Sequence, residues 1–534
     1  MPFTARRASL SLASFALALF AAACGGGKLP DATPTGPTQP VERPTLAQTY
    51  RPSGHADAGD VQVHLFEWPW KDIANECETV LGPAGYAAVQ ISPPQEHSLT
   101  PSRDWSERYQ PVSYSIARSR SGTEAEFTNM VARCKAVGVG IYVDAVINHM
   151  TNFPSPGTGS NGTAYSKYEY PGLYTAADFH TPCGINDYGV PAQVQDCELL
   201  GLPDLNTGSA TVRQKIANYL IMLGRLGVAG FRVDAAKHIQ PVELNKIFAL
   251  VDSTLVAEGK PASYFFLEVA SNSRDAVPPQ AYFGEGYSTG GTSDITEFTY
   301  KGVGNKFTGS NGEKISQLDP NGPPGAQFSV AAWGILPSDK AVAFLVNHDT
   351  QHDGGGVSYR NSYTFRLANV WMLAMPYGYP SVLSSYAFAF PTENSMGPRS
   401  DAAGWTLPVS CVSSFEVAVS GDWLCEHRDP YIRTMVAFRK VTAGTDVNHW
   451  GSNNGQAIWF SRGAKGFVAI NNELTALSST VATGLTAGTY CDRITGGKLG
   501  SACAGTAVTV GADGSVTLAV AAKRAIAIDV GTKL

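Results

Sequence analysis

Short apolar stretches typical of β-strands recur along most of the chain, with helical stretches between them. The predicted strands occupy residues 61–68, 86–92, 140–147, 230–235, 264–270, 341–348 and 379–386. Residues 123–138 and 210–227 read as helices. This alternation over such a length favours a parallel sheet closed into a (β/α)8 barrel. A doubly wound open sheet is the alternative, but no glycine-rich phosphate-binding loop follows the first strand.

One predicted strand carries charges where ions are costly. In "GFRVDAAKH" (residues 230–238), Phe231 and Val233 alternate with Arg232 and Asp234. Because successive side chains on a strand point to opposite faces, both charges lie on the same face. The helix that precedes this stretch suggests a strand packed on both sides. A charged pair in that position calls for a functional explanation.

Two other segments break the alternation. The connection from about residue 150 to 206 is rich in Gly, Pro, Tyr and Asn and is too long for a structureless loop. We therefore expect an inserted subdomain over residues 148–206, with the barrel formed by residues 57–147 and 207–442. From residue 443 to 534, strand-like stretches alternate with Gly and Asn turns, which predicts a C-terminal all-β sandwich.

The N-terminus has the features of an export signal. Arg6 and Arg7 precede an apolar run that ends in small residues before Cys24, so residues 1–23 are interpreted as a signal peptide. "AAAC" resembles a bacterial lipobox, in which Cys24 would be acylated, although Ala21 stands where leucine is usual. Ordinary secretion and a cell-surface lipoprotein both stay open. Residues 24–56, rich in Gly, Pro and Thr, read as a tether.

The composition of the chain limits the classes of molecule that it is expected to bind. The net charge is −6 and no Lys/Arg block occurs, which argues against nucleic acid. No further run is long enough to span a bilayer, so a membrane would be reached only through a lipid on Cys24. The chain has nine cysteines, and the eight other than Cys24 are an even number in an exported protein. Disulfides are expected, and their pairing does not follow from spacing.

Polar residues gather where the predicted strands finish. In a (β/α)8 barrel these ends form one face, on which catalytic residues converge. Three carboxylates at such a mouth suggest glycoside hydrolysis, with one nucleophile and one proton donor. The strand-end groups are Asp144, Asn148 and His149; Arg232, Asp234, Lys237 and His238; Glu268; and Asn347, His348 and Asp349.

The same stretches carry a family resemblance. "DAVINH", "GFRVDAAKH", "FFLEVA" and "FLVNHD", in this order, resemble the four signature regions of the alpha-amylase family. "WSERYQPVSY" (residues 105–114) and "YGYPSVLSSY" (residues 377–386) look more narrowly like animal-type alpha-amylases. The resemblance extends from about residue 61 to the C-terminus, including the insertion and the β-module.

The resemblance implies roles for individual residues. Asp234 would be the nucleophile, Glu268 the acid and base, and Asp349 the stabiliser of the oxocarbenium-like transition state. Arg232 would keep Asp234 ionised. The remaining substrate contacts would be His149, His348 and Tyr109 at the same sugar, and Trp105, Gln110, Lys237 and His238 at neighbouring subsites.

The resemblance also implies ions and crosslinks. Asn148 and Asp204 would bind Ca²⁺ through their side chains, and Gln195 and His238 through main-chain oxygens. Arg232 and Asn347 fit a chloride site, but Ser381 stands where a second arginine is expected, which predicts chloride independence. Ser106 replaces a second aromatic residue after Trp105. The cysteines would pair in sequence order: Cys77–Cys134, Cys183–Cys197, Cys411–Cys425 and Cys491–Cys503.

Together these features predict an exported, monomeric, calcium-dependent alpha-amylase. It would cleave internal α-1,4-glucosidic bonds of starch, glycogen and maltooligosaccharides with retention of configuration. One alternative is a maltogenic hydrolase or transglycosylase of the same family. A second is a non-catalytic glucan-binding surface lipoprotein, which the presence of all three carboxylates and both histidines disfavours.

Overall fold

The computed structural model describes residues 58–270, 274–283 and 293–534. The predicted signal peptide, Cys24 and the tether to residue 56 lie outside the described residues. No helix in the described part of the chain is long and apolar enough to cross a membrane.

Eight parallel strands form a closed barrel, which confirms the predicted fold class. The last strand pairs with the first, with Gln62 beside Ser381, and this pairing completes the ring. Every pair of neighbouring strands in the barrel is parallel, so the carboxyl ends of all eight strands form one rim. The strands are β1 (Gln62–Leu65), β2 (Ala88–Ile91), β5 (Gly140–Ala145), β8 (Gly230–Val233), β9 (Tyr264–Leu267), β10 (Asp294–Glu297), β11 (Ala341–Ala343) and β12 (Tyr379–Ser384).

The strand that sequence patterning did not predict is β10. Its four residues read "DITE", and both end positions are ionisable, so no apolar run marks it. The structure buries both acidic side chains and gives them partners. Asp294 accepts a hydrogen bond from the Tyr264 hydroxyl at 2.9 Å, and Glu297 accepts one from the Leu336 N–H at 2.6 Å. Hydrogen bonds from residues distant in sequence therefore stabilise this strand, which lacks the apolar pattern of the other barrel strands.

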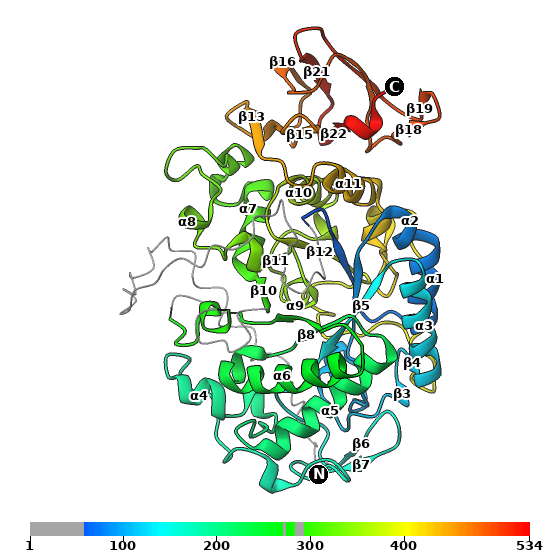
Figure 1. Cartoon of the computed structure of the whole chain (residues 1–534), viewed down its shortest axis with the longest axis vertical. Helices are drawn as coiled ribbons and strands as arrows, with labels where there is room; N and C mark the ends of the chain where they lie inside the picture. Colours follow the sequence, from blue (N-terminus) through cyan, green and yellow to red (C-terminus); the bar gives the residue numbers. More distant parts are fainter. Residues whose placement is uncertain (1–57, 271–273, 284–292) are drawn as a thin grey trace, which may run out of the picture.

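Helices surround the barrel (Figure 1). Local sequence sets their ends: Thr123 and Glu126 form a capping box at the start of α3, and Gly227 (φ 102°) ends α5 in a left-handed conformation. The helices are α1 (Trp70–Glu76), α2 (Gly82–Ala84), α3 (Glu124–Ala136), α4 (Pro191–Asp196), α5 (Ala210–Leu226), α6 (Pro241–Ala257), α7 (Val303–Thr308), α8 (Val330–Trp333), α9 (His348–His352), α10 (Tyr363–Ala374) and α11 (Pro430–Val441).

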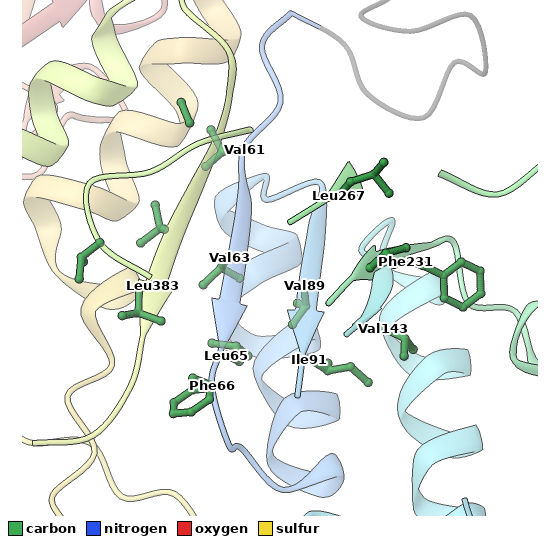
Figure 2. Packing of buried hydrophobic residues seen from close by; sticks show 14 of the residues in the cluster. Val61, Val63, Leu65, Phe66, Val89, Ile91, Val143, Phe231, Leu267 and Leu383 are labelled. Carbon is green, nitrogen blue, oxygen red and sulfur yellow. The ribbon is translucent and has the colours of Figure 1, made fainter. Parts of the chain in front are cut away.

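Alternation along the strands separates the apolar core from the polar lumen. Val63, Leu65, Val89 and Ile91 are completely buried and pack with Val143, Phe231 and Leu267 (Figure 2). The intervening residues of the same strands include Gln62, His64, Gln90 and Arg232. Because neighbouring side chains point to opposite faces, the apolar set packs against the helices, while these polar residues share the barrel interior with a second buried cluster that includes Tyr142, Tyr264 and Phe266.

The segment between β5 and β8 leaves the barrel at the rim formed by the carboxyl strand ends. It contains the short hairpin of β6 (Gly157–Thr158) and β7 (Ala164–Tyr165), followed by α4. The disulfide Cys183–Cys197 joins its second half. This insertion therefore stands beside the strand ends that carry the candidate site residues, with β6 and β7 at the far end of the molecule from the C-terminal strands (Figure 1).

The C-terminal part is all-β, as predicted. One sheet has the order β13-β14-β15-β22, and three two-stranded pairs join β16 to β21, β17 to β20 and β18 to β19. The strands are β13 (Val447–Ser452), β14 (Ala457–Arg462), β15 (Gly466–Asn471), β16 (Leu477–Ala482), β17 (Gly488–Cys491), β18 (Lys498–Leu499), β19 (Ala502–Cys503), β20 (Ala507–Val510), β21 (Ser515–Val520) and β22 (Arg524–Asp529).

A buried arginine joins this β-module to the barrel. The Arg462 guanidinium donates to the Ala374 carbonyl at the end of α10 and, through Nη2, to the Thr445 carbonyl at 2.9 Å. Since Ala374 shortly precedes β12, the module sits at the amino end of the strands. It therefore supports the barrel from the end opposite the candidate site.

All four predicted disulfides are present. Cys77–Cys134, Cys183–Cys197, Cys411–Cys425 and Cys491–Cys503 are bonded as the family resemblance implied. Each closes a loop within one part of the molecule, and the bond between Cys77 and Cys134, which are 57 positions apart, ties α3 to the segment after α1.

Candidate active site

A single guanidinium organises the acidic residues at the barrel mouth. Arg232 Nη1 lies 2.5 Å from Asp144 Oδ1 and 2.9 Å from Asp234 Oδ1, and its Nη2 lies 3.0 Å from Glu268 Oε2. These residues come from β5, β8 and β9 or from the positions directly after them. Both charges of the "GFRVD" stretch thus point into the barrel, and the arginine is the common partner of three carboxylates.

Exposure separates the four acidic residues of this cluster. The Asp144 side chain has no exposed surface, whereas Asp234 is 10%, Glu268 18% and Asp349 38% exposed. Asp144 accepts a hydrogen bond from the Tyr109 hydroxyl at 2.9 Å. Asp144 therefore orients Arg232 and Tyr109, and the other three carboxylates are the ones that a molecule in the mouth can touch.

Three carboxyl groups of the cluster, those of Asp144, Asp234 and Asp349, have raised pKa values because they are buried. Burial raises the pKa of Asp234 well above its ordinary value; Arg232 acts in the opposite direction, and Glu268 and Asp144 add to the increase. Burial, reinforced by Glu268, raises the pKa of Asp349 to about 8. Arg232 thus lowers the pKa of Asp234, the direction expected from its role, but burial and the neighbouring carboxylates outweigh it. Such a site can hold one carboxyl protonated beside another that is ionised.

The residue after Asp234 has an unusual backbone conformation. Ala235 has φ 49°, in the left-handed region that side chains other than glycine rarely adopt. In this conformation its N–H donates to Glu268 Oε2 at 2.8 Å. The turn between Asp234 and the short helix Ala236–His238 thus fixes the Glu268 carboxylate relative to its neighbour, and it is the kind of local strain found at functional sites.

Rings form one wall of the mouth. The Tyr109 and His348 rings stack with centroids 5.1 Å apart and an interplanar angle of 5°, and Trp105 lies 5.7 Å from His348. His149 Nε2 is 3.0 Å from the Tyr109 carbonyl oxygen. Burial lowers the pKa of His149 to about 4 and that of His348 well below its usual value. Both imidazoles are therefore neutral and able to donate or accept hydrogen bonds at neutral pH.

Three buried rings that pack against this wall were not among the predicted site residues. Phe66 stacks on His348 at 5.0 Å, His352 lies 4.7 Å from Trp105, and His64 lies 5.3 Å from His348. His64 and Phe66 belong to the carboxyl end of the first strand, where the same strand-end reasoning applies. His352 lies on α9 and carries no comparable signal.

Lys237 and His238 stand on another side of the mouth. Lys237 Nζ is 2.6 Å from Asp275 Oδ2 and donates to the Ala270 carbonyl at 2.9 Å. Tyr188 of the insertion covers this ammonium group, 4.9 Å from its ring centroid, and also lies 6.2 Å from the His238 ring. Sequence patterning missed Tyr188, because the insertion shows no periodicity that marks an inward-facing ring.

Gln110 connects the mouth to the insertion. Its Oε1 accepts hydrogen bonds from the Thr151 hydroxyl at 2.9 Å and from the Phe153 N–H at 3.2 Å. The side chain thus fixes the start of the insertion against the segment that carries Trp105 and Tyr109.

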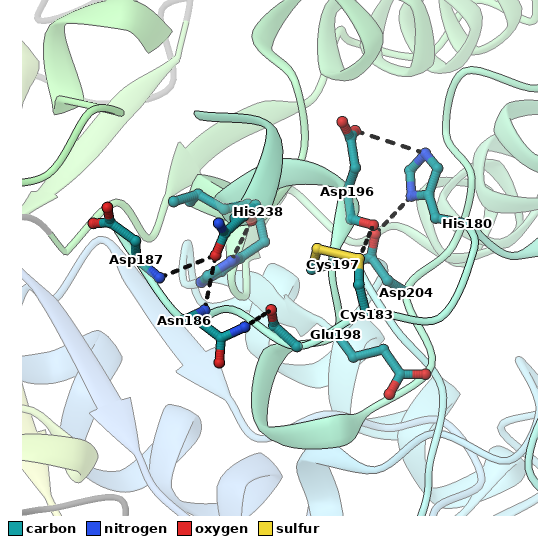
Figure 3. The surroundings of a disulfide bond; sticks show 12 residues. His180, Cys183, Asn186, Asp187, Asp196, Cys197, Glu198, Asp204 and His238 are labelled. Atoms are coloured by element: carbon teal, nitrogen blue, oxygen red, sulfur yellow. Dashed lines mark hydrogen bonds and ion pairs between the residues drawn. A yellow bond between two sulfur atoms is a disulfide. The ribbon is translucent and has the colours of Figure 1, made fainter. Parts of the chain in front are cut away.

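The predicted calcium ligands converge between β5, the insertion and the turn after β8. The His238 Nδ1 lies 2.7 Å from the carbonyl of Val194, next to Gln195, and His180 lies 2.7 Å from Asp204 Oδ2 (Figure 3). The second Asp204 oxygen, Oδ1, is buried without a hydrogen-bond partner, and the Asn148 amide interacts with the same carboxyl group.

These residues fit a hard cation. Burial raises the pKa of Asp204 to about 7, since its charge is poorly solvated, and a nearby cation would relieve that cost. The Gln195 side chain interacts with the Tyr282 hydroxyl at 3.4 Å, which leaves its main-chain oxygen as the available donor. Among the described residues no three His, Cys, Asp or Glu side chains are arranged so that they could hold a metal ion by themselves, so the donors would be mainly amide and main-chain oxygens.

The predicted chloride position lies deeper in the barrel. Arg232, Asn347 and Ser381 line one small pocket, together with His64 and Gln90. Asn347 also caps α9, accepting a hydrogen bond from the Thr350 N–H at 2.9 Å. Ser381 supplies no charge here, and the positive charge of Arg232 is already opposed by three carboxylates.

Comparison with known proteins agrees with this geometry. The profile of the alpha amylase C-terminal all-beta domain matches residues 449–531. An alpha-amylase of Tenebrio molitor is 41% identical over 482 residues, covering 88% of this chain and 97% of that protein. An alpha-amylase of Tribolium castaneum is 42% identical over 486 residues, covering 88% and 94%.

Solved structures give the same result. Wild-type alpha-amylase I from Eisenia fetida is similar with a TM-score of 0.79 and 36% sequence identity, covering 88% of this chain and 97% of that one. A mutant of the same enzyme, crystallised with maltohexaose, gives the same TM-score and coverage.

A parallel barrel with carboxylates gathered at the carboxyl strand ends is the fold and site type of many glycoside hydrolases. Because alpha-amylases match 88% of the chain at 41–42% identity, the chain belongs to the alpha-amylase family. Within that family of glycoside hydrolases it is of the animal type. The family resemblance predicted from the four motifs is confirmed.

The raised pKa of Asp349 predicts a pH-dependent cost in stability. The folded protein binds this proton more tightly than the unfolded chain, so the associated stability is complete below about pH 4 and is lost as pH rises through about 8. Asp349→Asn cannot ionise. Because the carboxyl reaches solvent, we expect a gain of about 1 kcal/mol, or on the order of 2 °C in Tm, at pH 9 relative to the wild type.

Scanning calorimetry of both proteins at pH 5, 7 and 9 measures this difference. We expect it to be smallest at pH 5 and to grow with pH. A difference in Tm that is independent of pH would contradict the shifted pKa.

Proposed function

We propose that the protein is an endo-acting alpha-amylase that hydrolyses internal α-1,4-glucosidic bonds of starch, glycogen and maltooligosaccharides with retention of configuration. The observation that carries this proposal is the contact of Asp234 and Glu268 with neighbouring nitrogens of the same guanidinium at the mouth. Two carboxyl groups held close together suit the double displacement of a retaining glycosidase.

In the first step, Asp234 attacks the anomeric carbon while Glu268 gives its proton to the leaving glycosidic oxygen. The carbon–oxygen bond of the glycoside breaks, and an ester bond to Asp234 forms. In the second step, water loses a proton to Glu268 and attacks the same carbon, which releases Asp234. Both carboxylates end in their starting states.

The remaining residues position the sugar and stabilise charge. Asp349, the most exposed carboxylate, would bind sugar hydroxyls and stabilise the oxocarbenium-like transition state. The neutral imidazoles of His149 and His348 would hydrogen-bond the same sugar, and Tyr109 would stack on it. Arg232 limits the repulsion among the carboxylates. Trp105, Gln110, Lys237 and His238 would contact the neighbouring sugar units.

We propose the ligand set Asn148, Gln195, Asp204 and His238 for Ca²⁺. A bound calcium ion supplies positive charge that fixes the insertion to the barrel. The unpaired Asp204 Oδ1 and the link from His238 to the helix of Gln195 support this assignment.

We further propose the division of the chain into barrel (57–147 and 207–442), insertion (148–206) and β-sandwich (443–534), and a monomeric state. The apolar run before Cys24 supports export, with either free secretion or a lipid on Cys24.

Replacing Glu268 tests the catalytic assignment. Glu268→Gln keeps the size and the hydrogen-bonding capacity but cannot donate or accept the transferred proton. We expect the release of reducing ends from soluble starch to fall by about 10²- to 10⁴-fold. The matched control is Glu258→Gln, which alters an exposed pair with Arg225 and should retain wild-type activity.

The product analysis separates this function from its alternatives. An endo-acting enzyme lowers the viscosity of starch early and releases products in the α configuration. Products dominated by maltose would favour a maltogenic hydrolase, and products longer than a maltotriose substrate would favour a transglycosylase. Starch binding without any hydrolysis would favour the glucan-binding lipoprotein.

Calcium removal should lower stability before it affects chemistry. We expect a chelator to reduce the Tm of the wild type, and added Ca²⁺ to restore it, because the ion links two parts of the molecule. Asp204→Asn should start from a lower Tm and respond much less to Ca²⁺. Equal responses of the wild type and Asp204→Asn would contradict the ligand assignment.

Chloride should not activate the enzyme. Since Arg232 is the one arginine that lines the predicted chloride pocket among the described residues, and it faces three carboxylates while Ser381 is neutral, we expect equal activity when chloride is exchanged for gluconate at constant ionic strength. An increase of several-fold with chloride would contradict this prediction.

A further inference from the structure

An exposed aromatic side chain stands at the edge of the mouth without a structural role in the core. Phe153 is 59% exposed, and it belongs to none of the hydrophobic clusters formed by the described residues. Isolated exposed apolar residues are common on protein surfaces, so exposure alone carries no argument. The position of Phe153 and the way its backbone is held distinguish it.

The backbone around Phe153 is fastened to the segment that carries the aromatic wall. The Phe153 N–H and the Thr151 hydroxyl both donate to Gln110 Oε1, at 3.2 Å and 2.9 Å. The Thr151 N–H donates to the Pro111 carbonyl at 2.9 Å, and the Tyr170 hydroxyl donates to the Thr151 carbonyl at 2.5 Å. Four hydrogen bonds thus hold the three residues that end in Phe153.

The same segment begins at His149, one of the residues proposed to bind the reacting sugar. His149, whose ring touches the Tyr109 carbonyl, precedes Phe153 by four residues, which span at most about 14 Å when extended. That reach corresponds to a few sugar units of a bound chain. On the facing segment, Trp105 offers a ring, but Ser106 beside it offers none, so a glucan that continues past Trp105 lacks a second aromatic surface there.

We propose that Phe153 is a distal subsite residue, whose ring stacks on a glucose unit of long substrates beyond the units held by Trp105 and Gln110. This proposal rests on the proposed function and extends it to chain-length preference. The apolar CH face of a pyranose packs on an aromatic ring, and a ring whose backbone is already fixed loses little conformational freedom when the substrate arrives. The insertion would therefore favour long glucans over short ones.

The test compares kcat/KM for maltoheptaose and for maltotriose. In Phe153→Ala we expect the ratio of the two values, long over short, to fall about three- to tenfold through a higher KM for maltoheptaose. Phe153→Trp keeps an aromatic ring at this position and should keep the wild-type ratio. Leu474→Ala, at an 84% exposed position in the β-module, is the matched control and should keep the wild-type ratio.

Two outcomes would overturn the proposal. One is an unchanged ratio in Phe153→Ala, and the other is an equal loss on both substrates, which would indicate a general defect of the insertion. Calorimetric binding of maltoheptaose and maltotriose, measured with and without Phe153→Ala in a Glu268→Gln background that slows hydrolysis, separates this inference from the catalytic proposal. If the wild type bound maltoheptaose without hydrolysing it, the proposed function would fail, while the effect of Phe153→Ala on affinity would still decide the role of the ring.

Discussion

The Arg232 guanidinium is the interaction on which the rest of the site depends. It is buried on the inward face of β8 and contacts Asp144, Asp234 and Glu268 at once. A lone buried cation would be expensive, and three buried carboxylates without it would repel each other. Together they form a group in which carboxylates outnumber the cation, and burial raises the pKa values of Asp144 and Asp234 within it.

The β-module and the insertion contact the barrel at opposite ends of its strands. At the amino end of the strands, Arg462 ties the β-module to α10 through main-chain carbonyls. At the carboxyl end, the insertion contributes Tyr188 over Lys237, and the Gln110 side chain fixes the insertion's first residues, which include Phe153. The candidate calcium ligands lie where that insertion meets the residues after β5 and β8. The β-module is thus attached away from the mouth, whereas the insertion borders it.

Much of this architecture followed from local pattern. Seven of the eight strands were visible as apolar runs, and the polar residues at their ends include the carboxylates that the structure brings together. The eighth strand was missed because Asp294 and Glu297 break the apolar pattern and are stabilised only by Tyr264 and Leu336, which are distant in sequence. His352 and Tyr188 were missed for a related reason, since a helix and an irregular insertion carry no period that shows which way a ring points.

By itself, the sequence determined the barrel, the strand-end chemistry, the family and, through that family, the disulfide pairing, because periodicity and motif order are local properties of the chain. The tertiary structure decided how charge is shared. One arginine, placed by the pleat of β8 among side chains from two other strands, meets three carboxylates, and burial then raises the pKa values of Asp234 and Asp349. Such shifts depend on solvent exclusion and on distances between strands, which no linear pattern contains.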